Sequence, residues 1–403
     1  MSEYKSSLLR LLDERGHIHQ LTDAVALDAL ACREIVTGYV GFDPTAPSLH
    51  VGNLASIMLL RRVQQAGHKP IVIMGGGTAK VGDPSGKDDT RKMLDAAQLK
   101  ANIASIQGSF ERVLAFDGSA TGATLIDNDD WLSQLGYIEL LRDVGRHFTI
   151  NRMLTFDSVK LRLDREQPLT FLEFNYMILQ AYDFLKLSRD YGCRLQLGGS
   201  DQWGNIVNGI ELARRIDGTE VFGVTAPLIT KSDGSKMGKT ASGAIWLNED
   251  QLPGYDFWQY WRNTDDRDVG RFLRLFTDLP LEEVARLESL GGAEINHAKA
   301  VLANEVTRLV RGEDAARTAE ATASTTFTGG VGEDLPVLVL SEGMTIAAAC
   351  TALGFTASNS EAKRKIAEGA LWLDEEAITD PASPARPGRL RLGKKRHALL
   401  RVT

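Results

Sequence analysis

The segment at residues 41–54, GFDPTAPSLHVGNL, carries side chains that could bind a polyphosphate. Thr45 and His50 can each donate a hydrogen bond to an anionic oxygen. An apolar run at 35–42 precedes the segment, and apolar residues at helical spacing follow it. A strand that turns directly into a helix presents the free amides of the helix N-terminus to anions. The segment therefore predicts a phosphate site at a strand-to-helix turn.

A second glycine-rich segment at 75–87, GGGTAKVGDPSGK, follows an apolar run at 70–74. It fits neither the P-loop template, whose first glycine would fall on Val81, nor the dinucleotide-binding template. We interpret the segment as a pocket wall at the carboxyl end of a strand, carrying Thr78 and Asp83. An ordinary surface loop is the alternative, because loops also collect glycine for conformational reasons.

The run at 171–185, FLEFNYMILQAYDFL, is apolar on nearly every side and predicts a buried helix. Tyr176, Gln180 and Asp183 are spaced so that they share one face of that helix. A carboxylate buried without a partner costs several kcal/mol or becomes protonated. The stripe is therefore a ligand site or a structural hydrogen-bond network, and the spacing leaves both open.

Polar residues also follow a predicted short strand at 194–197, in the sequence GGSDQWGN. Gly199 would let a ligand approach the backbone, and Asp201 and Gln202 would face it at the end of the strand. The alternative for Asp201 is that it caps the helix that follows.

The segment at 231–240, KSDGSKMGKT, predicts a mobile loop with three lysines, two glycines and small hydroxyl residues. Such a loop could bring the ammonium groups of Lys236 and Lys239 onto a phosphate chain during a reaction. A solvated basic loop is the alternative.

These segments need a scaffold, and the first of them predicts a βαβ unit, which binds ligands where its first strand ends. Further helices are expected in the first thirty residues, at 99–114 and around 131–148, with a strand at 123–126. Helical patterns at 255–276 and 281–309 predict a small α-helical domain. A chain of 403 residues suggests two or three domains.

The composition is that of an ordinary soluble protein. No apolar run is long enough to span a membrane and the N-terminus lacks a signal-peptide pattern, so we expect a cytoplasmic protein without membrane association. Cys32, Cys193 and Cys350 are isolated and should be reduced thiols, with no zinc site or disulfide framework. A net charge of -7 argues against indiscriminate nucleic-acid binding but allows a local basic surface.

A basic unit is predicted at the C-terminus, after a glycine-containing linker. Helices are expected at 345–353 and, behind a capping box at 358–361, at 362–368. Strands are expected at 371–373 and 389–392. The last eighteen residues contain seven basic side chains and no acidic one, and with the basic residues of the second helix they predict a phosphate-contacting face. A merely solvated surface is the alternative.

Taken together and in this order, the segments resemble bacterial and organellar-type tyrosyl-tRNA synthetases over nearly the whole chain. Pro44 to Asn53 is similar to the HIGH motif of class I synthetases, and Lys236 to Thr240 is similar to their KMSKS motif. GSDQWGN and the helix at 171–185 resemble the family's pocket segments. The C-terminal unit resembles the S4 RNA-binding domain.

The resemblance implies an α/β fold with a class I Rossmann-like parallel-sheet catalytic domain, a small α-helical anticodon-binding domain and a C-terminal α+β S4-like domain. The corresponding boundaries are 1–245, which includes the KMSKS-like loop, 246–325, a linker at 326–336, and 337–403. The implied reaction joins L-tyrosine to ATP as tyrosyl-adenylate with loss of pyrophosphate, and then transfers tyrosine to the terminal ribose of tRNA(Tyr). A homodimer and Mg²⁺ held through the phosphates are also implied.

The resemblance further assigns roles to individual residues. Tyrosine would be bound by Tyr39, Asp83, Tyr176, Gln180, Asp183 and Gln202, with Tyr39 and Asp183 at the phenol. ATP would be bound by Gly41, Asp43, His50, Gly52, Asn53, Gly199, Asp201, Met237 and Lys239. Catalysis would rest on Thr45, His50, Lys236 and Lys239. The tRNA would contact Lys363, Arg364, Lys365, Lys394, Lys395 and Arg396.

The sequence departs from the family pattern in three places. Val40 stands where many relatives have a cysteine that contacts the ribose, so that hydrogen bond is absent. Asn53 replaces the second histidine of HIGH, although an amide can still donate to a ribose oxygen. Gly238 and Thr240 replace the serines of the generic KMSKS motif.

Two other functions compete with this one. The first is a related class I adenylate-forming enzyme, such as a tryptophanyl-tRNA synthetase, against which Tyr39, Asp183 and the S4-like unit argue. The second is an RNA-binding protein on a synthetase scaffold, against which His50 and the lysines of the KMSKS-like loop argue.

Overall fold

The computed structural model describes residues 2–83, 94–232, 234, 237–240, 243–327, 335–393 and 396–402. The chain divides into two compact units. The first comprises residues 1–229 with 274–276, and the second comprises residues 230–273 with 277–403.

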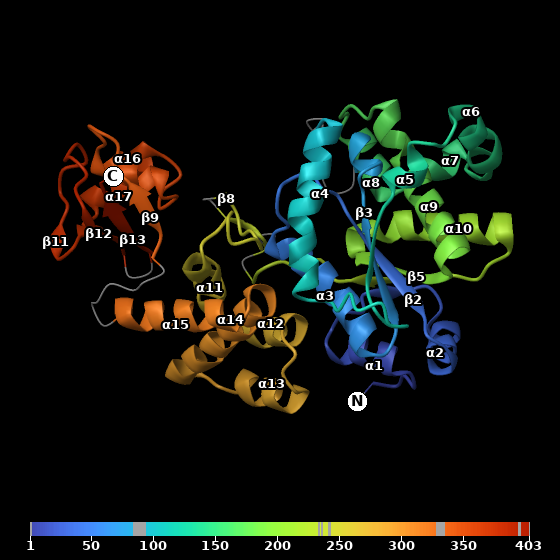
Figure 1. The fold of residues 1–403 in the computed structure, drawn as a ribbon, viewed down its shortest axis with the longest axis horizontal. Helices are drawn as coiled ribbons and strands as arrows, with labels where there is room; N and C mark the ends of the chain where they lie inside the picture. The colour runs from blue at the N-terminus through green and yellow to red at the C-terminus, as the bar shows by residue number, and fades with distance from the viewer. Residues whose placement is uncertain are drawn as a thin grey trace. The chain divides into compact units, whose positions relative to one another are not determined.

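The first unit is built on a six-stranded sheet in the order β1-β6-β5-β2-β3-β4 (Figure 1). All neighbouring strands are parallel except β1 and β6, which pair antiparallel. The bounds are β1 Gln20–Leu21, β2 Thr37–Phe42, β3 Lys69–Met74, β4 Thr124–Asp127, β5 Cys193–Gly199 and β6 Phe222–Ala226. The sheet confirms the predicted Rossmann-like fold class, and β1 is a strand that the helical prediction for the first thirty residues missed.

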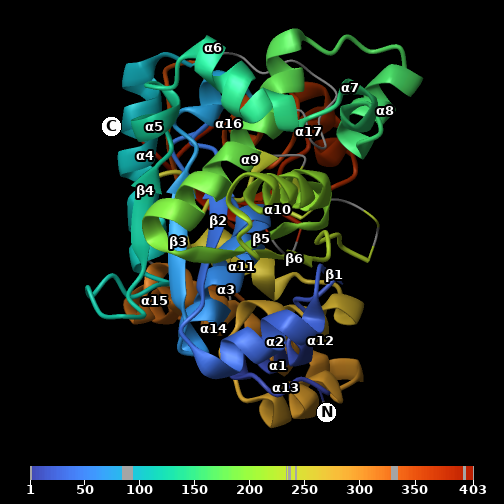
Figure 2. The same ribbon diagram turned by 90° about the vertical axis from the view of Figure 1, so that its right-hand side faces the viewer.

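Helices cover both faces of this sheet, with α3 and α4 on one side and α9 and α10 on the other (Figures 1 and 2). These layers explain why β2, β3 and β6 are buried at every position except Gly41, which is exposed, and Lys69, which is half-buried. The helices of the unit, apart from the short ones after β4, are α1 Ser7–Glu14, α2 Ala24–Arg33, α3 Val51–Gln65, α4 Ala96–Glu111, α9 Phe171–Tyr191 and α10 Trp203–Asp217.

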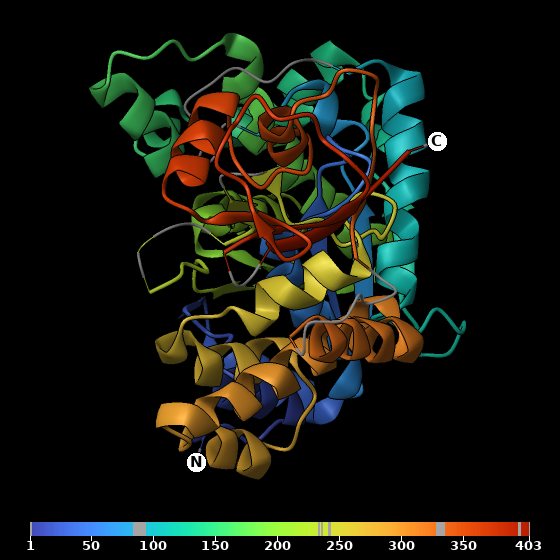
Figure 3. The same cartoon turned by 90° about the vertical axis from the view of Figure 1, so that its left-hand side faces the viewer.

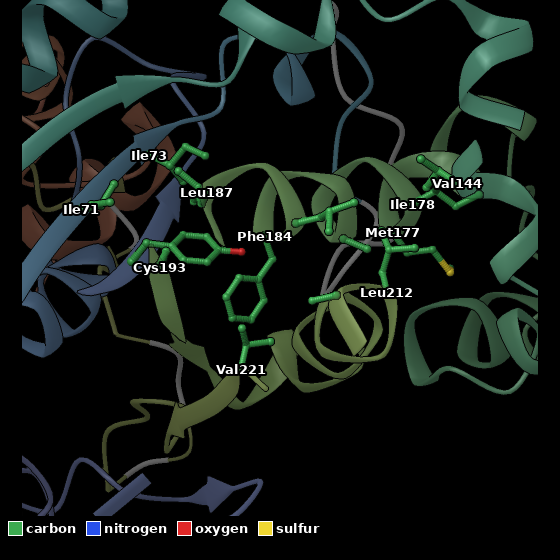
Figure 4. Close-up of a cluster of buried hydrophobic side chains, with 14 of the residues drawn as sticks. Ile71, Ile73, Val144, Met177, Ile178, Phe184, Leu187, Cys193, Leu212 and Val221 are labelled. Atoms are coloured by element: carbon green, nitrogen blue, oxygen red, sulfur yellow. The ribbon is translucent and has the colours of Figure 1, made fainter. Parts of the chain in front are cut away.

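Helix α9 supplies much of the core of the first unit. It begins at a capping box formed by Thr170 and Glu173 and ends at Gly192, whose φ of 61° is the left-handed conformation that favours glycine. Phe184 of α9 points from the helix toward Val221 (Figure 4). Gly209 of α10 lies against the Phe184 ring, where a Cβ atom would approach to 2.9 Å. The two helices therefore pack closely, which holds the polar face of α9 in place.

The stretch after β4 forms several short helices, so the helical stretch expected around 131–148 is confirmed in part and is interrupted at residues 133–136. The pieces are α5 Asp129–Leu132, α6 Tyr137–Glu139, a π-helical turn at Leu140–Val144, a 3-10 turn at Gly145–His147, α7 Ile150–Met153 and α8 Asp157–Asp164. Gly136 and Gly145 fall at breaks between these pieces.

The second unit begins with a small hairpin, β7 Lys239–Thr240 and β8 Gly243–Ala244, followed by helices. The helices are α11 Gly254–Arg262, α12 Val269–Phe276, α13 Leu281–Glu288, α14 Ile295–Arg311 and α15 Glu313–Phe327. The last three residues of α12 are grouped with the first unit. Trp261 lies at their centre, with edge-on ring contacts to Phe257, Tyr260 and Phe272. These helices confirm the predicted helical region.

The C-terminal part has a separate hydrophobic core between one sheet and two helices, shown in red in Figure 3. The five-stranded sheet has the order β11-β10-β12-β13-β9. Its bounds are β9 Val337–Val339, β10 Leu371–Leu373, β11 Glu376–Ala377, β12 Gly388–Leu392 and β13 Arg396–Arg401, with helices α16 Ile346–Ala352 and α17 Asn359–Ala367. The predicted capping box forms only in part, because Ser358 caps the amide of Glu361 whereas the Glu361 carboxylate accepts from Ala357.

Candidate active site

The parallel strands β2, β3, β4 and β5 end at the same edge of the sheet, and polar residues follow each of them. Asp43 follows β2, the glycines at 75–77 follow β3, Asn128 follows β4, and Gln202 follows β5. The sheet order thus gathers segments that are far apart in the sequence.

Tyr39 and Asp183 form one end of the site. Both are buried, and the Tyr39 hydroxyl has no hydrogen-bond partner in the part of the chain that the structure describes. Burial, followed by the nearby charges of Asp183 and Cys193, raises the pKa of Tyr39 well above its usual value. The hydroxyl therefore stays protonated and can donate a hydrogen bond to a ligand.

Two donors hold the Asp183 carboxylate. Asn128 Nδ2 donates to Oδ2 at 2.8 Å, and Trp131 Nε1 donates to Oδ1 at 2.8 Å. Burial raises the pKa of Asp183 to about 7, against the opposing effect of these two bonds, and the charges of Asp127 and Asp43 raise it further. The carboxyl group therefore titrates near neutral pH.

Asn128 also organises the glycine-rich turn after β3. Its Oδ1 accepts from the amides of Gly77 at 2.8 Å and Thr78 at 3.4 Å, and its Nδ2 donates to Thr78 Oγ1 at 3.1 Å. Gly76 donates its amide to Asp127 Oδ1 at 3.0 Å, and a Cβ atom on Gly76 would overlap that carboxylate. Residues 75–78 are thus a packed wall and not a plain surface loop.

The sequence reasoning missed Asn128 and Trp131. The rule applied to the other strands, that polar residues at a carboxyl end face the ligand, would have selected Asn128 after the predicted strand at 123–126. The same rule would not have selected Trp131, because this residue lies in α5 and not at the end of the strand.

Asp83, Gln180 and Gln202 come together at the other end of the site. Gln202 Nε2 donates to Asp83 Oδ2 at 3.1 Å, and Gln180 Nε2 donates to Gln202 Oε1 at 3.3 Å. The Gln180 Oε1 atom is buried and has no partner among the described residues. Tyr176 is buried one turn before Gln180 on the same helix. The polar stripe of α9 and the segment after β5 therefore line one region, as the resemblance predicts.

His50 and Asn53 lock the turn into α3. His50 is the N-cap residue, and its Nδ1 accepts the amide of Gly52 at 3.0 Å, while its own amide donates to Asn53 Oδ1 at 3.1 Å. Because Nδ1 is an acceptor, the neutral imidazole carries its proton on Nε2. Asn102 of α4 donates to the carbonyl of Pro44 at 2.8 Å, which ties down the start of the motif. Thr45 is exposed beside it.

Asp201 is exposed in a 3-10 turn at Ser200–Gln202. The N-cap residue of α10 is Gln202, which makes no capping bond with its side chain, so the capping alternative for Asp201 is wrong. Gly199 lies directly before this 3-10 turn, and a Cβ atom added to it would lie 2.5 Å from Asp201 Oδ1. Gly41 is exposed in β2, next to buried Val40.

The KMSKS-like residues belong to the second unit. Lys236 lies outside the described residues. Met237 is buried, and Lys239 and Thr240 form the backbone of β7.

The predicted tRNA-contacting residues differ in their partners. Lys363 is exposed on α17, whereas Arg364 and Lys365 pair with Glu368 at 3.8 Å and 2.8 Å. Arg396 donates to the carbonyl of Phe355. Lys394 and Lys395 lie outside the described residues.

In the described ranges, no group of three or more His, Cys, Asp or Glu side chains is arranged to hold a metal ion. No helix in those ranges is both long and apolar enough to cross a bilayer. All three cysteines are free, and burial raises the pKa of Cys193 and Cys350 to about 12.

Known proteins match this chain over most or all of its length. The sequence profile described as tRNA synthetases class I (W and Y) matches residues 33–328. The tyrosine–tRNA ligase of Novosphingobium aromaticivorans is 66% identical over 407 residues, covering 100% of both chains. The tyrosine–tRNA ligase of Zymomonas mobilis is 59% identical over 410 residues, again covering 100% of both.

Solved structures agree with these matches. A C-terminally truncated mitochondrial tyrosyl-tRNA synthetase of Aspergillus nidulans superposes with a TM-score of 0.71 at 31% identity, covering 78% of this chain and 92% of that one. The tyrosyl-tRNA synthetase of Archaeoglobus fulgidus shares the fold, with a TM-score of 0.56 at 18% identity over 77% of this chain and 99% of that one. The chain therefore belongs to the tyrosine–tRNA ligases, in the tryptophan and tyrosine branch of the class I tRNA synthetases.

Proposed function

We propose that the chain activates L-tyrosine with ATP and transfers it to tRNA(Tyr), with the residues named above in specific roles. The observation that carries the proposal is the buried pair at one end of the site. Tyr39 offers a hydroxyl that has no partner among the described residues, and Asp183 offers a carboxylate already oriented by Asn128 and Trp131. Such a pair fits a phenol, which can donate one hydrogen bond and accept another.

Tyr39 and Asp183 would also provide discrimination against phenylalanine. A site built to bond a hydroxyl leaves its own buried polar groups unpaired when the hydroxyl is missing, and this enzyme family is the standard example of that rejection. At the other end, Asp83, Tyr176 and Gln180 hold the α-amino group, and Gln202 lies near the carboxylate. Gln180 Oε1 supports this, because it is buried without a partner in the described part of the chain and can accept from an ammonium.

The first chemical step is an attack of the tyrosine carboxylate on the α-phosphate of ATP. A bond forms between the carboxylate oxygen and phosphorus, the bond to the β-phosphate oxygen breaks, and pyrophosphate leaves with the electron pair. The attacking group is already an anion, so no general base is needed, and positioning and charge stabilisation carry the catalysis. In the second step a ribose hydroxyl of the tRNA attacks the activated carbonyl, and AMP leaves.

Thr45 and His50 stabilise the leaving pyrophosphate from the scaffold, and Lys236 and Lys239 do so from the KMSKS-like segment. The Nε2–H of His50 supports this role, because its Nδ1 is occupied by the amide of Gly52. The described residues offer no carboxylate cage, so Mg²⁺ fits only as an ion held by the phosphates, where it would neutralise their charge.

The remaining contacts to ATP fall on backbone and polar groups around the two strand ends. Asn53 would donate its Nδ2 hydrogens to the ribose, because its Oδ1 already accepts from the amide of His50. Asp201, which is exposed and does not cap α10, would accept from the ribose hydroxyls. The other residues proposed to contact ATP are Gly41, Asp43, Gly52, Gly199, Met237 and Lys239.

The C-terminal unit would bind the tRNA backbone through the basic residues of α17 and the final strand region. Lys363 supports this, since it is exposed and has no ion-pair partner among the described residues. The proposed set also includes Arg364, Lys365, Lys394, Lys395 and Arg396.

A homodimer is proposed as well, because apolar side chains are exposed between α6 and the start of α9. Ile138 is 73% exposed, Ile150 is 59% exposed, and Phe171 is 68% exposed. Exposed apolar groups concentrated in one segment mark an interaction surface. Ile138→Asp should therefore shift sedimentation toward monomer, and a wild-type protein that sediments as a monomer would contradict the dimer.

The test of the proposed function is ATP–pyrophosphate exchange with the purified full chain, run with each amino acid in turn. Exchange with tyrosine and not with phenylalanine is expected. No exchange with tyrosine, or equal exchange with both, would contradict the proposal. tRNA binding without any exchange would favour an RNA-binding protein on a synthetase scaffold.

A further inference from the structure

The segment that carries the KMSKS-like motif is held at both ends by buried charged side chains of the helical region. Asp268 precedes α12, and Arg311 ends α14. Both are at most 5% exposed. Neither belongs to the residues that the family resemblance assigns to tyrosine, ATP or tRNA.

Asp268 fixes the start of the segment. Its Oδ2 accepts the backbone amide of Ser232 at 2.9 Å, and its Oδ1 accepts from Arg271 Nη2 at 3.0 Å. The same Arg271 nitrogen donates to the carbonyl of Thr230. Lys231 lies between these contacts, with its ammonium 5.3 Å from the centre of the Tyr260 ring. Three consecutive residues are thus attached to the helices.

Arg311 fixes the end of the segment. Its guanidinium donates to the carbonyls of Leu247 at 3.2 Å, Leu252 at 2.7 Å and Trp246 at 3.1 Å, and it stacks 4.3 Å from the centre of the Phe257 ring. Between the two anchors, the hairpin of β7 and β8 closes with a bond from the Ile245 amide to the Gly238 carbonyl.

These contacts limit where the motif's lysines can act. Ser232 is four residues before Lys236, and a chain of four residues spans at most about 14 Å. Fixing Ser232 therefore confines the region that the Lys236 ammonium can reach. Catalysis by positioned charge is sensitive to such placement, since a displacement of about 1 Å can cost on the order of a hundredfold in rate.

We propose that Asp268, oriented by Arg271, is a positioning residue for tyrosine activation, because it fixes the start of the segment that carries the KMSKS-like motif. The inference rests on the role proposed above for Lys236 and Lys239. A buried carboxylate that lost its partners would be strongly unfavourable, so the carboxylate, the Ser232 amide and Arg271 act as one unit.

The test compares Asp268→Asn with Asp265→Asn in the full chain. Asp265 is a matched control, because it lies three residues away, is exposed, and its carboxylate bonds only to Arg267 among the described residues. Asp268→Asn should lower kcat for tyrosine-dependent exchange by about tenfold or more while KM for tyrosine changes by less than about twofold, since the motif acts on the transition state and not on tyrosine. Asp265→Asn should leave both values unchanged.

A double-mutant cycle with Lys236→Ala separates positioning from a general structural effect. If Asp268 acts through the segment, Lys236→Ala should cost much less in the Asp268→Asn background than in the wild type. Arg271→Gln, at a side chain that is 40% exposed, tests the same anchor if the buried substitution prevents folding.

The outcomes distinguish this inference from the proposed function. Additive losses, an unchanged kcat in both anchor variants, or an equal loss of tyrosine affinity would overturn the role of Asp268. A wild-type chain without exchange would overturn the proposed function instead, and an unchanged Lys236→Ala variant would overturn the role of the lysine.

Discussion

Asp183 shows how a single residue can serve function at the expense of stability. Its carboxylate lies in the apolar core beside Tyr39, where burial raises its pKa to about 7. The bonds from Asn128 and Trp131 offset part of that cost. If the phenol of bound tyrosine donates a further hydrogen bond to this carboxylate, the ligand offsets more of the cost of burying it.

Tyr39→Phe should reduce discrimination between tyrosine and phenylalanine. The substitution removes one hydrogen bond to the phenol, worth about 0.5–1.5 kcal/mol, so kcat/KM for tyrosine should fall about 2- to 12-fold. Exchange with phenylalanine should not fall, because that ligand makes no such bond. Exchange kinetics with both amino acids measure the ratio, and an equal loss with both would contradict the assigned contact.

The free energy of unfolding of the Asp183→Asn variant should increase relative to that of the wild type as pH rises. The folded-state pKa of about 7 exceeds the ordinary value of 3.8, so between these values the folded chain keeps a proton that the unfolded chain has lost. The wild type therefore loses stability as pH rises, by about 1.4 kcal/mol per pH unit, and the loss is complete above pH 7.

Denaturant unfolding of both proteins at pH 5 and pH 7 measures this difference. Asp130→Asn, at an exposed carboxylate of α5, controls for the loss of a charge nearby. A stability difference between wild type and Asp183→Asn that is the same at both pH values would show that the carboxyl group titrates normally.

For individual residues, the sequence predicted which polar side chains share one helix. It did not predict which residues those side chains contact. Tyr176, Gln180 and Asp183 follow from helical spacing alone. Asn128 and Trp131 reach Asp183 only because β4 lies next to β3 in the sheet. The residue spacing within a single segment does not predict the order of the strands.

At the scale of elements, the turn after β3 depends on close packing against the end of β4. Gly76→Ala should displace residues 75–78, because the added methyl group would overlap the Asp127 carboxylate. We expect a loss of about 1–3 kcal/mol in stability, typical of overpacking, together with reduced tyrosine-dependent exchange.

Gly108→Ala is the matched control for that substitution. Gly108 lies in α4, and an added Cβ atom there would meet nothing within 4 Å. Alanine in a helix interior should stabilise by about 0.5–1 kcal/mol. Thermal unfolding of both variants gives the comparison, and a harmless Gly76→Ala would mean that the turn has room to relax.

Elements with a strong pattern were predicted well, and some of the strands that were missed have only two residues each. The strands β2 and β3 and the helix α3 follow from apolar patterns within a few residues of their observed ends, and α9 begins as expected but continues to Tyr191, beyond the expected end at 185. β1, with two residues, and β11, also with two, are held by pairing with distant strands and have no pattern of their own.

At the scale of the whole molecule, the C-terminal part has its own core and should be separable from amino acid activation. Removing the residues after Gly330 should leave tyrosine-dependent exchange within about twofold and lower kcat/KM for tRNA charging at least roughly tenfold, through lost phosphate contacts. Charging assays on both proteins measure this.

Lys363→Glu in the full chain should weaken charging in the same direction, and more so at low salt than at high salt. Unchanged charging after truncation would mean that the C-terminal unit is not the tRNA anchor. The sequence indicated this unit through its composition, since basic residues without acidic neighbours are visible without any structure. It could not indicate that Arg364 and Lys365 share Glu368.

His50 caps a helix and is also proposed to act in catalysis. These two roles affect how the sequence would change if selection for catalysis were removed. His50 caps α3 through both its ring and its backbone, a contribution of about 0.5–2 kcal/mol that selection for folding alone would preserve. Selection for folding alone would not preserve Asp183, since replacing it with an apolar residue would relieve an unfavourable burial. In a duplicated copy that had drifted into a purely RNA-binding role, we therefore expect Asp183 to be lost early and His50 to persist. An intact histidine is weak evidence that such a copy is still an enzyme, and an intact aspartate is strong evidence.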